Sequence, residues 1–326
     1  MSLLALPNEL LNVIITYLET ERDINALVQT SRHLYTQLND YLYAHDIIHT
    51  EAYAIYWAVH KAVLTENQAV RESSLRTAQL IFQQRVPTPK EAVRAFHRAL
   101  REAVRYGAED LVRLFISHGI GPNPDPRLGS RTGGCRPALH DAIRSGHDRI
   151  VLLLMSAGAD PYLTQWGVNA LDIAVQSQHV PITWHLLEMG VDPHRAGHYP
   201  LCIAATRGSE LIVQLLLKKG VDPNAEVMPR RQDRPLHYAV RAGHEPVVRL
   251  LLEQGADPDA VSASAQTPLY MAAENGRVGI VNLLLERGAD PNRVAYQGTA
   301  LDVARAAWRQ VEDKTRHEAV IRILGG

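Results

Sequence analysis

Two kinds of apolar block alternate along residues 95–326 of this chain. The first is short and in four of its six copies begins at a proline or at the residue before one, as in PALHDAI at Pro137 and TPLYMAA at Thr267. The second follows about twelve residues later and is almost purely aliphatic, as in IVLLL at Ile150 and GIVNLLL at Gly279. Blocks of this length and spacing are typical of short helices with one buried face. The alternation therefore predicts repeated pairs of antiparallel helices, each with a short inner helix and an aliphatic outer helix.

A recurring turn separates the helix pairs. The tetrapeptide Gly-Ala/Val-Asp-Pro recurs at intervals of 32, 30, 35 and 33 residues, beginning at Gly158, Gly190, Gly220, Gly255 and Gly288. Glycine ends the outer helix in the left-handed conformation. Asp-Pro continues as extended, turning backbone, because the residue before proline is kept out of the helical region. One such unit cannot bury its own apolar face, so stacking must complete the core.

These motifs resemble ankyrin repeats, through a period near 33 residues, inner helices that read like TPLH-x-A and turns that read G-A-D-P. The resemblance implies an all-α solenoid of stacked helix–turn–helix units with short β-turns, in about seven repeats over residues 95–326. An early copy is readable in residues 99–123, and the last copy has about seven extra residues (309–316) between its helices. The resemblance also implies that His140 and His237 form structural hydrogen bonds between neighbouring turns.

Residues 1–45 do not follow this repeat. A helix with an apolar stripe is predicted from Pro7, and two further short helices are predicted from Asp23 and Ser31. Three short helices bury too little surface to be stable alone. The first is apolar on two adjacent faces, which is typical of a partner interface. The segment resembles an F-box of the form common in fungi, through LPNELL followed by DINAL, RHLY and LY.

The F-box resemblance implies docking on a Skp-family adaptor of an SCF-type (cullin–RING) ubiquitin ligase. The adaptor contacts that it implies are Leu6, Pro7, Glu9, Leu10, Leu11, Ile14 and Leu18. The alternative is that the same apolar face packs as a helical cap on the first repeat. Residues 46–94 are interpreted as a helical linker, in which a degenerate repeat could begin at Ala54.

The composition narrows the class of protein. The 34 basic and 35 acidic residues give a net charge of −1, which argues against binding of nucleic acid or of an anionic membrane through the overall charge of the protein. Two cysteines make no disulfide framework, so we expect a reducing compartment, cytoplasmic or nuclear. No apolar stretch approaches the ~20 residues of a spanning helix. Outside its complexes the protein is expected to be a monomer.

No motif indicates catalysis or a cofactor, so we expect a non-enzymatic protein. Glycine-rich phosphate loops and a Ser/His/Asp set are absent, and the aspartates of the inner helices are dispersed over separate repeats. His194, His198 and Cys202 are spaced four apart, as metal ligands on one helix face would be. The repeat, however, places the two histidines in a turn and the cysteine in a helix. No metal site is therefore predicted.

Candidate protein-binding residues lie at turn tips and at exposed positions of inner helices, which line the concave side of a solenoid. These candidates are Trp166, Tyr199, Tyr238, Met271, Tyr296, Arg230 and Arg231. Aromatic and methionine anchors suit a protein partner, and loop arginines suit an acidic or phosphorylated segment. The alternatives are packing between adjacent turns for the aromatic residues and a solvated rim for the arginines.

Together these features predict a substrate-recognition subunit of an SCF-type ubiquitin ligase, with an unidentified protein substrate on the solenoid. The alternative is a plain ankyrin scaffold or inhibitor whose N-terminal helices only cap the repeats. A third interpretation is an enzyme with an unrecognised site in residues 46–95. Binding of a Skp-family adaptor distinguishes the first two.

Overall fold

The computed structural model describes residues 90–124, 136–195, 199–225, 233–310 and 314–325. The chain divides into two compact units, Met1–Ser130 and Arg131–Gly326, and each is described by itself. The predicted F-box-like segment and all but the end of the predicted linker lie outside the described residues. Among the described helices, none is long and apolar enough to span a membrane.

The described part of the first unit is one helix pair. α6 (Lys90–Arg105) and α7 (Glu109–Ser117) pack against each other through a fully buried core that includes Leu100, Val104, Val112 and Phe115. Gly107, with a φ of 76°, lies in the turn between them. This pair confirms the early helix–turn–helix copy that the sequence predicts in residues 99–123.

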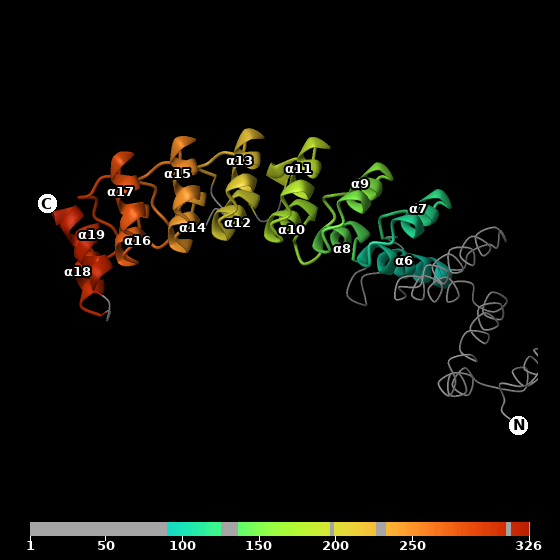
Figure 1. The fold of residues 1–326 in the computed structure, drawn as a ribbon, viewed down its shortest axis with the longest axis horizontal. Helices are drawn as coiled ribbons and strands as arrows, with labels where there is room; N and C mark the ends of the chain where they lie inside the picture. The colour runs from blue at the N-terminus through green and yellow to red at the C-terminus, as the bar shows by residue number, and fades with distance from the viewer. Residues whose placement is uncertain (1–89, 125–135, 196–198, 226–232, 311–313, 326) are drawn as a thin grey trace, which may run out of the picture. The chain divides into compact units, whose positions relative to one another are not determined.

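The described part of the second unit is a row of six helix pairs, which confirms the predicted all-α solenoid. The inner helices are α8 (Ala138–Arg144), α10 (Ala170–Gln176), α12 (Pro200–Arg207), α14 (Pro235–Ala242), α16 (Pro268–Glu274) and α18 (Ala300–Trp308). The outer helices are α9 (Asp148–Ser156), α11 (Val180–Glu188), α13 (Glu210–Lys218), α15 (Glu245–Glu253), α17 (Val278–Glu286) and α19 (Thr315–Gly325). Each helix packs against its pair-mate and against the corresponding helix of the next pair (Figure 1).

Three inner helices, α10, α16 and α18, begin with a side-chain cap of the predicted kind, whereas α8 and α12 begin without one. Thr267 Oγ1 accepts a hydrogen bond from the backbone N–H of Tyr270 at 3.1 Å, and Pro268 follows in the first turn, where its missing N–H costs nothing. Asn169 and Thr299 form reciprocal capping boxes with the aspartates three residues later. These caps fix the residue at which α10, α16 and α18 begin after the preceding turn.

The core lies between inner and outer helices of stacked pairs. Fully buried alanines of the inner helices, such as Ala174, Ala204 and Ala239, allow close approach, and aliphatic residues of the outer helices, such as Leu216 and Leu251, fill the space between them. Deleting a buried leucine side chain of this kind costs about 2–5 kcal/mol. The aliphatic stripe predicted from the sequence is therefore the element that holds neighbouring repeats together.

Side chains in the Asp-Pro turns link each repeat to the next. Asn224 Nδ2 donates to the carbonyl of Gly255 at 2.9 Å, and Asn224 Oδ1 accepts from the backbone N–H of Asp257 at 2.8 Å. Asp259 accepts from the N–H of Asp290 in the same way at 3.0 Å. These bonds satisfy backbone groups that the turns leave exposed. They also set the spacing of consecutive turns.

A second set of links lies at the opposite end of the helices. His244 Nε2 lies 3.1 Å from the carbonyl oxygen of Thr206, and His317 Nε2 lies 3.1 Å from that of Glu274. Each histidine covers the left-handed glycine that ends the inner helix of the preceding repeat, which is Gly208 for His244. A side chain at that glycine would collide with the histidine ring.

Candidate protein-binding surface

Trp166 lies at the tip of a tight turn and is 78% exposed. The turn is closed by reciprocal backbone hydrogen bonds between Gln165 and Val168, at 3.0 and 3.1 Å. Trp166 and Gly167 both have positive φ, 54° and 78°, as the centre of a type I′ turn requires. The Arg136 guanidinium carbon lies 5.5 Å from the centroid of the indole ring. A large aromatic side chain is thus presented to solvent on a fixed backbone.

Tyr296 occupies the equivalent turn four repeats later and is 62% exposed. The backbone N–H of Ala295 donates to the carbonyl of Gly298 at 2.8 Å, which closes this turn. Val294, next to it, is also exposed. Within the described residues these two turns hold isolated β-bridges and no longer strand. Trp166 and Tyr296 thus lie at turn tips, and their role in binding a partner stays a prediction.

The other predicted aromatic and methionine anchors are less exposed to solvent than Trp166 and Tyr296. Tyr199 is half-buried at the start of α12, with a left-handed φ of 52°, and its carbonyl accepts from the N–H of Cys202 at 2.9 Å. Tyr238 is half-buried, and the Arg241 guanidinium carbon lies 5.7 Å from its ring centroid. Met271 is 2% exposed, so its side chain belongs to the core and is not a surface anchor. Its expected role as an exposed inner-helix residue is corrected accordingly.

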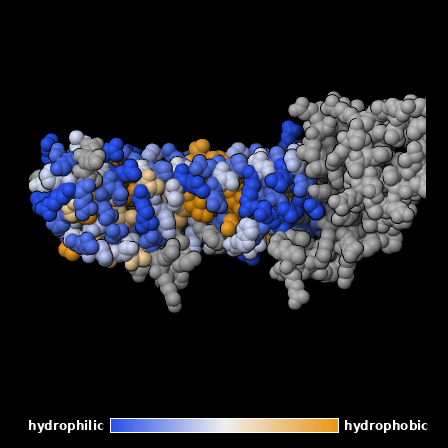
Figure 2. Space-filling view, turned by 90° about the horizontal axis from the view of Figure 1, so that it is seen from below, coloured by the Kyte–Doolittle hydropathy of each residue, from blue (hydrophilic) through white to orange (hydrophobic). Residues whose placement is uncertain are grey.

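The variable position of the inner helices forms one row along the solenoid. Its members from α10 to α18 are Ile173, Ile203, Tyr238, Met271 and Val303. Ile203, Tyr238 and Val303 are half-buried, whereas Ile173 and Met271 are buried. Figure 2 shows a largely hydrophilic surface with an apolar patch near the middle of the row, level with α10–α13 in Figure 1. The solenoid therefore presents exposed aromatic side chains at turn tips and an apolar surface patch, and a protein partner can contact both.

Exposed arginines end several inner helices. Arg144, Arg207 and Arg241 lie in the last turns of α8, α12 and α14, where a positive charge also complements the helix dipole. Arg241 pairs with Asp233 at 3.4 Å, and Arg234 pairs with Asp257 at 3.3 Å. The predicted contacts Arg230 and Arg231 lie outside the described residues.

The buried histidines of the inner helices are structural. His237 Nδ1 accepts from the N–H of Arg234 at 3.0 Å, and its Nε2 lies 3.1 Å from the carbonyl oxygen of Ala260 in the next turn. This confirms the predicted link between turns. Burial lowers the pKa of His237, although the Ala260 carbonyl opposes the decrease. The neutral His237 imidazole, whose two ring nitrogens contact its own helix start and the next turn, therefore stabilises the packing of one repeat on the next.

His140 occupies the same position in an earlier repeat, but neither of its ring nitrogens has a hydrogen-bond partner among the described residues, so the predicted link between turns is found at His237 and not at His140. Pro137 stands where Arg234 stands in the later repeat, and proline has no N–H to donate to His140 Nδ1. Burial, followed by the nearby charge of Arg144, lowers the pKa of His140 to about 4. The imidazole is therefore neutral over the ordinary pH range.

The described residues hold no group of three or more side chains that could bind a metal ion. Cys202 is buried, and burial raises the pKa of its thiol, so it lacks the thiolate character of a nucleophile or a metal ligand. His194 is exposed in a short 3₁₀ helix (Pro193–Arg195) apart from the helix of Cys202. His198, the third residue of the pattern, lies outside the described residues.

A family model described as ankyrin repeats (3 copies) matches this chain in four overlapping stretches, at residues 100–197, 139–227, 171–262 and 201–295. The matches together cover more than half of the chain. They begin within α6, include α7 to α17, and end before α18 and α19.

Parts of curated proteins, and a solved ankyrin-repeat structure, are similar to this chain. A Danio rerio protein named "Putative palmitoyltransferase ZDHHC13" is 35% identical over 134 residues, 39% of this chain and 20% of that protein. Ankyrin repeat and SOCS box protein 5 of Mus musculus is 37% identical over 100 residues, 28% of this chain and 29% of that protein. The crystal structure of the human ASB11 ankyrin repeat domain superposes with a TM-score of 0.59 at 27% identity, over 70% of this chain and 97% of that domain. The chain thus matches less than a third of either curated relative.

Proposed function

Because this chain belongs to the ankyrin-repeat family, whose repeats bind protein partners, we propose that it is a substrate-recognition subunit of an SCF-type ubiquitin ligase. In this proposal residues 1–45 bind a Skp-family adaptor and the solenoid binds a protein substrate. The observation that carries it is the F-box-like pattern LPNELL…DINAL…RHLY ahead of the repeats. The working compartment would be the cytoplasm or the nucleus.

The described surface supports a binding role for the solenoid. Trp166 and Tyr296 are exposed on turns whose backbone is closed by hydrogen bonds, so little conformational entropy is lost when a partner covers them. Buried aromatic side chains are frequent hot spots of protein interfaces. The relatives named for a SOCS box provide further support, because their names join ankyrin repeats to a second module.

The subunit would act without chemistry of its own. A solenoid whose repeats are joined by buried leucines and by links such as Asn224–Asp257 presents a substrate on a surface of fixed geometry. Holding two reactants together raises their effective concentration, which is how a binding subunit accelerates a transfer reaction.

Copurification with a Skp-family adaptor tests the adaptor half of the proposal. The full chain should retain the adaptor, and the double variant Leu6→Ala/Pro7→Ala should lose it. Asn12→Ala, a polar position between the stripe residues, is the matched control and should bind normally. Failure of the unmodified chain to bind would favour the alternative, an ankyrin scaffold or inhibitor without a ligase.

A further inference from the structure

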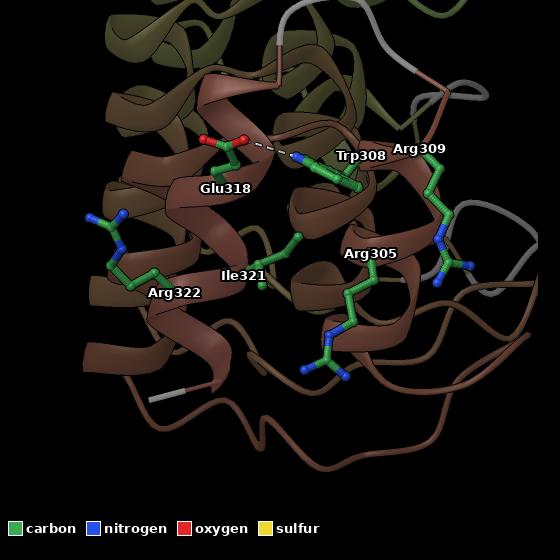
Figure 3. A pocket seen from close by; sticks show the side chains of 6 residues that line it. All are labelled: Arg305, Trp308, Arg309, Glu318, Ile321 and Arg322. Atoms are coloured by element: carbon green, nitrogen blue, oxygen red, sulfur yellow. Dashed lines mark hydrogen bonds between the residues drawn. The ribbon is translucent and has the colours of Figure 1, made fainter.

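The last two helices of the solenoid enclose an open cleft of about 450 Å³. Its lining residues are Arg305, Trp308, Arg309, Glu318, Ile321 and Arg322 (Figure 3). Trp308 and Ile321, both half-buried, supply the apolar part of the lining, and Lys314 Nζ lies 4.4 Å from the centroid of the Trp308 ring, over one of its faces. Three arginines stand around them against one glutamate, so the cleft carries an excess of positive charge.

The acidic side chains of α18 and α19 are already engaged. Glu318 Oε1 accepts a hydrogen bond from Trp308 Nε1 at 3.2 Å. Asp302 accepts from the backbone N–H and the hydroxyl of Thr299, at 2.9 and 2.7 Å, in the capping box of α18. Among the residues that the structure describes, Arg305, Arg309 and Arg322 form no ion pair with a carboxylate.

The positions of the arginines indicate the form of the ligand. Figure 3 shows the guanidinium groups of Arg305, Arg309 and Arg322 pointing in different directions, with Ile321 between Arg305 and Arg322. They do not converge on one point, as they would around a single phosphate group. Carboxylates spaced along a chain can reach them separately, each through a charge-assisted hydrogen bond. An interaction with the helix dipole explains single arginines at helix ends. It does not explain why Trp308 and Ile321 lie among the arginines of this cleft.

We propose that this cleft binds an acidic segment of a partner protein, a stretch rich in Asp and Glu with one large apolar residue. The apolar residue would pack on Trp308 and Ile321, and the carboxylates would pair with the three arginines. The proposal concerns only α18 and α19 and does not depend on adaptor binding by residues 1–45.

Fluorescence anisotropy of labelled peptides with the full chain tests this proposal. The probe is a short peptide of alternating Glu and Asp with one central Leu. We expect it to bind, to weaken about tenfold when the Leu is replaced by Ser, and to bind far better than a Lys/Arg peptide of the same pattern. Raising the ionic strength from about 0.1 M to about 1 M, which shortens the Debye length from about 10 Å to about 3 Å, should weaken binding strongly.

Charge reversal locates the site. Arg305→Glu/Arg322→Glu should weaken binding of the acidic peptide by about tenfold or more. Arg149→Glu/Lys218→Glu, which changes the net charge equally on the outer helices α9 and α13, should leave binding unchanged. If the first variant unfolds at lower temperature than the parent, Arg305→Gln/Arg322→Gln replaces it, with the same direction of effect.

Three results would overturn the proposal: no binding of the acidic peptide, equal loss in both charge-reversal variants, or binding that the cleft variants leave intact. A peptide with one phosphoserine and no other acidic residue provides the last arm. It should bind more weakly than the acidic peptide, and tighter binding would overturn the assignment to a carboxylate-rich segment.

Discussion

Gly208 allows the sharpest test of how neighbouring repeats are joined. It ends α12 in the left-handed conformation, with φ 71° and ψ 21°. A Cβ added there would lie 2.5 Å from His244 Nδ1 and 2.6 Å from His244 Cε1. The ring would have to move, and its hydrogen bond to the Thr206 carbonyl would be lost. Gly255 is the matched control, because its φ is 87° and nothing lies within 4 Å of its added Cβ.

The expected magnitudes follow from these contacts. The left-handed conformation costs a non-glycine residue about 1–2 kcal/mol, and this term applies to Gly208→Ala and to Gly255→Ala alike. Gly208→Ala also loses the His244 hydrogen bond, worth about 0.5–1.5 kcal/mol, and the packing of the displaced ring. We therefore expect Gly208→Ala to lower the free energy of unfolding by about 1 kcal/mol more than Gly255→Ala.

Urea unfolding of the full chain, followed by circular dichroism, measures the difference. Repeat arrays can unfold in more than one step, so midpoints are compared only where the slopes agree. His244→Ala completes a double-mutant cycle. In that background the cost of Gly208→Ala should fall to that of Gly255→Ala. Equal costs for the two glycines in the parent chain, or a Gly208→Ala cost that His244→Ala leaves unchanged, would refute the reasoning.

Three further predictions concern the turns, the buried histidine and the exposed tryptophan. Asn224→Ala removes two hydrogen bonds to the next turn and should cost about 1–3 kcal/mol in urea unfolding, whereas Asn292→Ala, exposed at the same position of a later repeat, should cost less than about 0.5 kcal/mol. His140 has a pKa of 6.5 when unfolded and about 4 when folded. As the pH falls, the unfolded chain therefore binds a proton at His140 before the folded chain does, and the contribution of neutral His140 to stability is complete only above pH 6.5. That stability should decrease by up to about 3 kcal/mol as the pH falls from 6.5 to 4, and His140→Gln should show a shallower dependence of the urea midpoint on pH. Trp166→Ala should leave the melting temperature unchanged within about 1 °C because the side chain is exposed, yet weaken capture of a protein partner; a lower melting temperature would instead assign Trp166 to packing.

Local residue patterns predict most of the solenoid. The Gly-Ala/Val-Asp-Pro turns, the capped starts at Thr267 and Thr299 and the aliphatic outer helices all lie where the sequence places them. These features are local, because a cap, a proline and a left-handed glycine each act within one turn of the chain. The histidine link of His237 to the next turn was also predictable, from the resemblance to ankyrin repeats.

The sequence pattern does not predict the links through Asn224, Asp259, His244 and His317. Their signals were present as a polar residue after Asp-Pro and a histidine before or within an outer helix, but each bond joins residues about 30 or more positions apart. Only the stacking distance between repeats brings those groups within reach.

The binding surface divides in the same way between local and tertiary causes. Trp166 and Tyr296 were identifiable because a turn tip is exposed by its own backbone geometry. The burial of Met271 and the cleft beside Trp308 were not, because the exposure of an inner-helix residue depends on how the neighbouring repeats pack over it. Period and turn chemistry therefore settle which elements form and in what order. The packing of one repeat on the next decides which of their side chains a partner can reach.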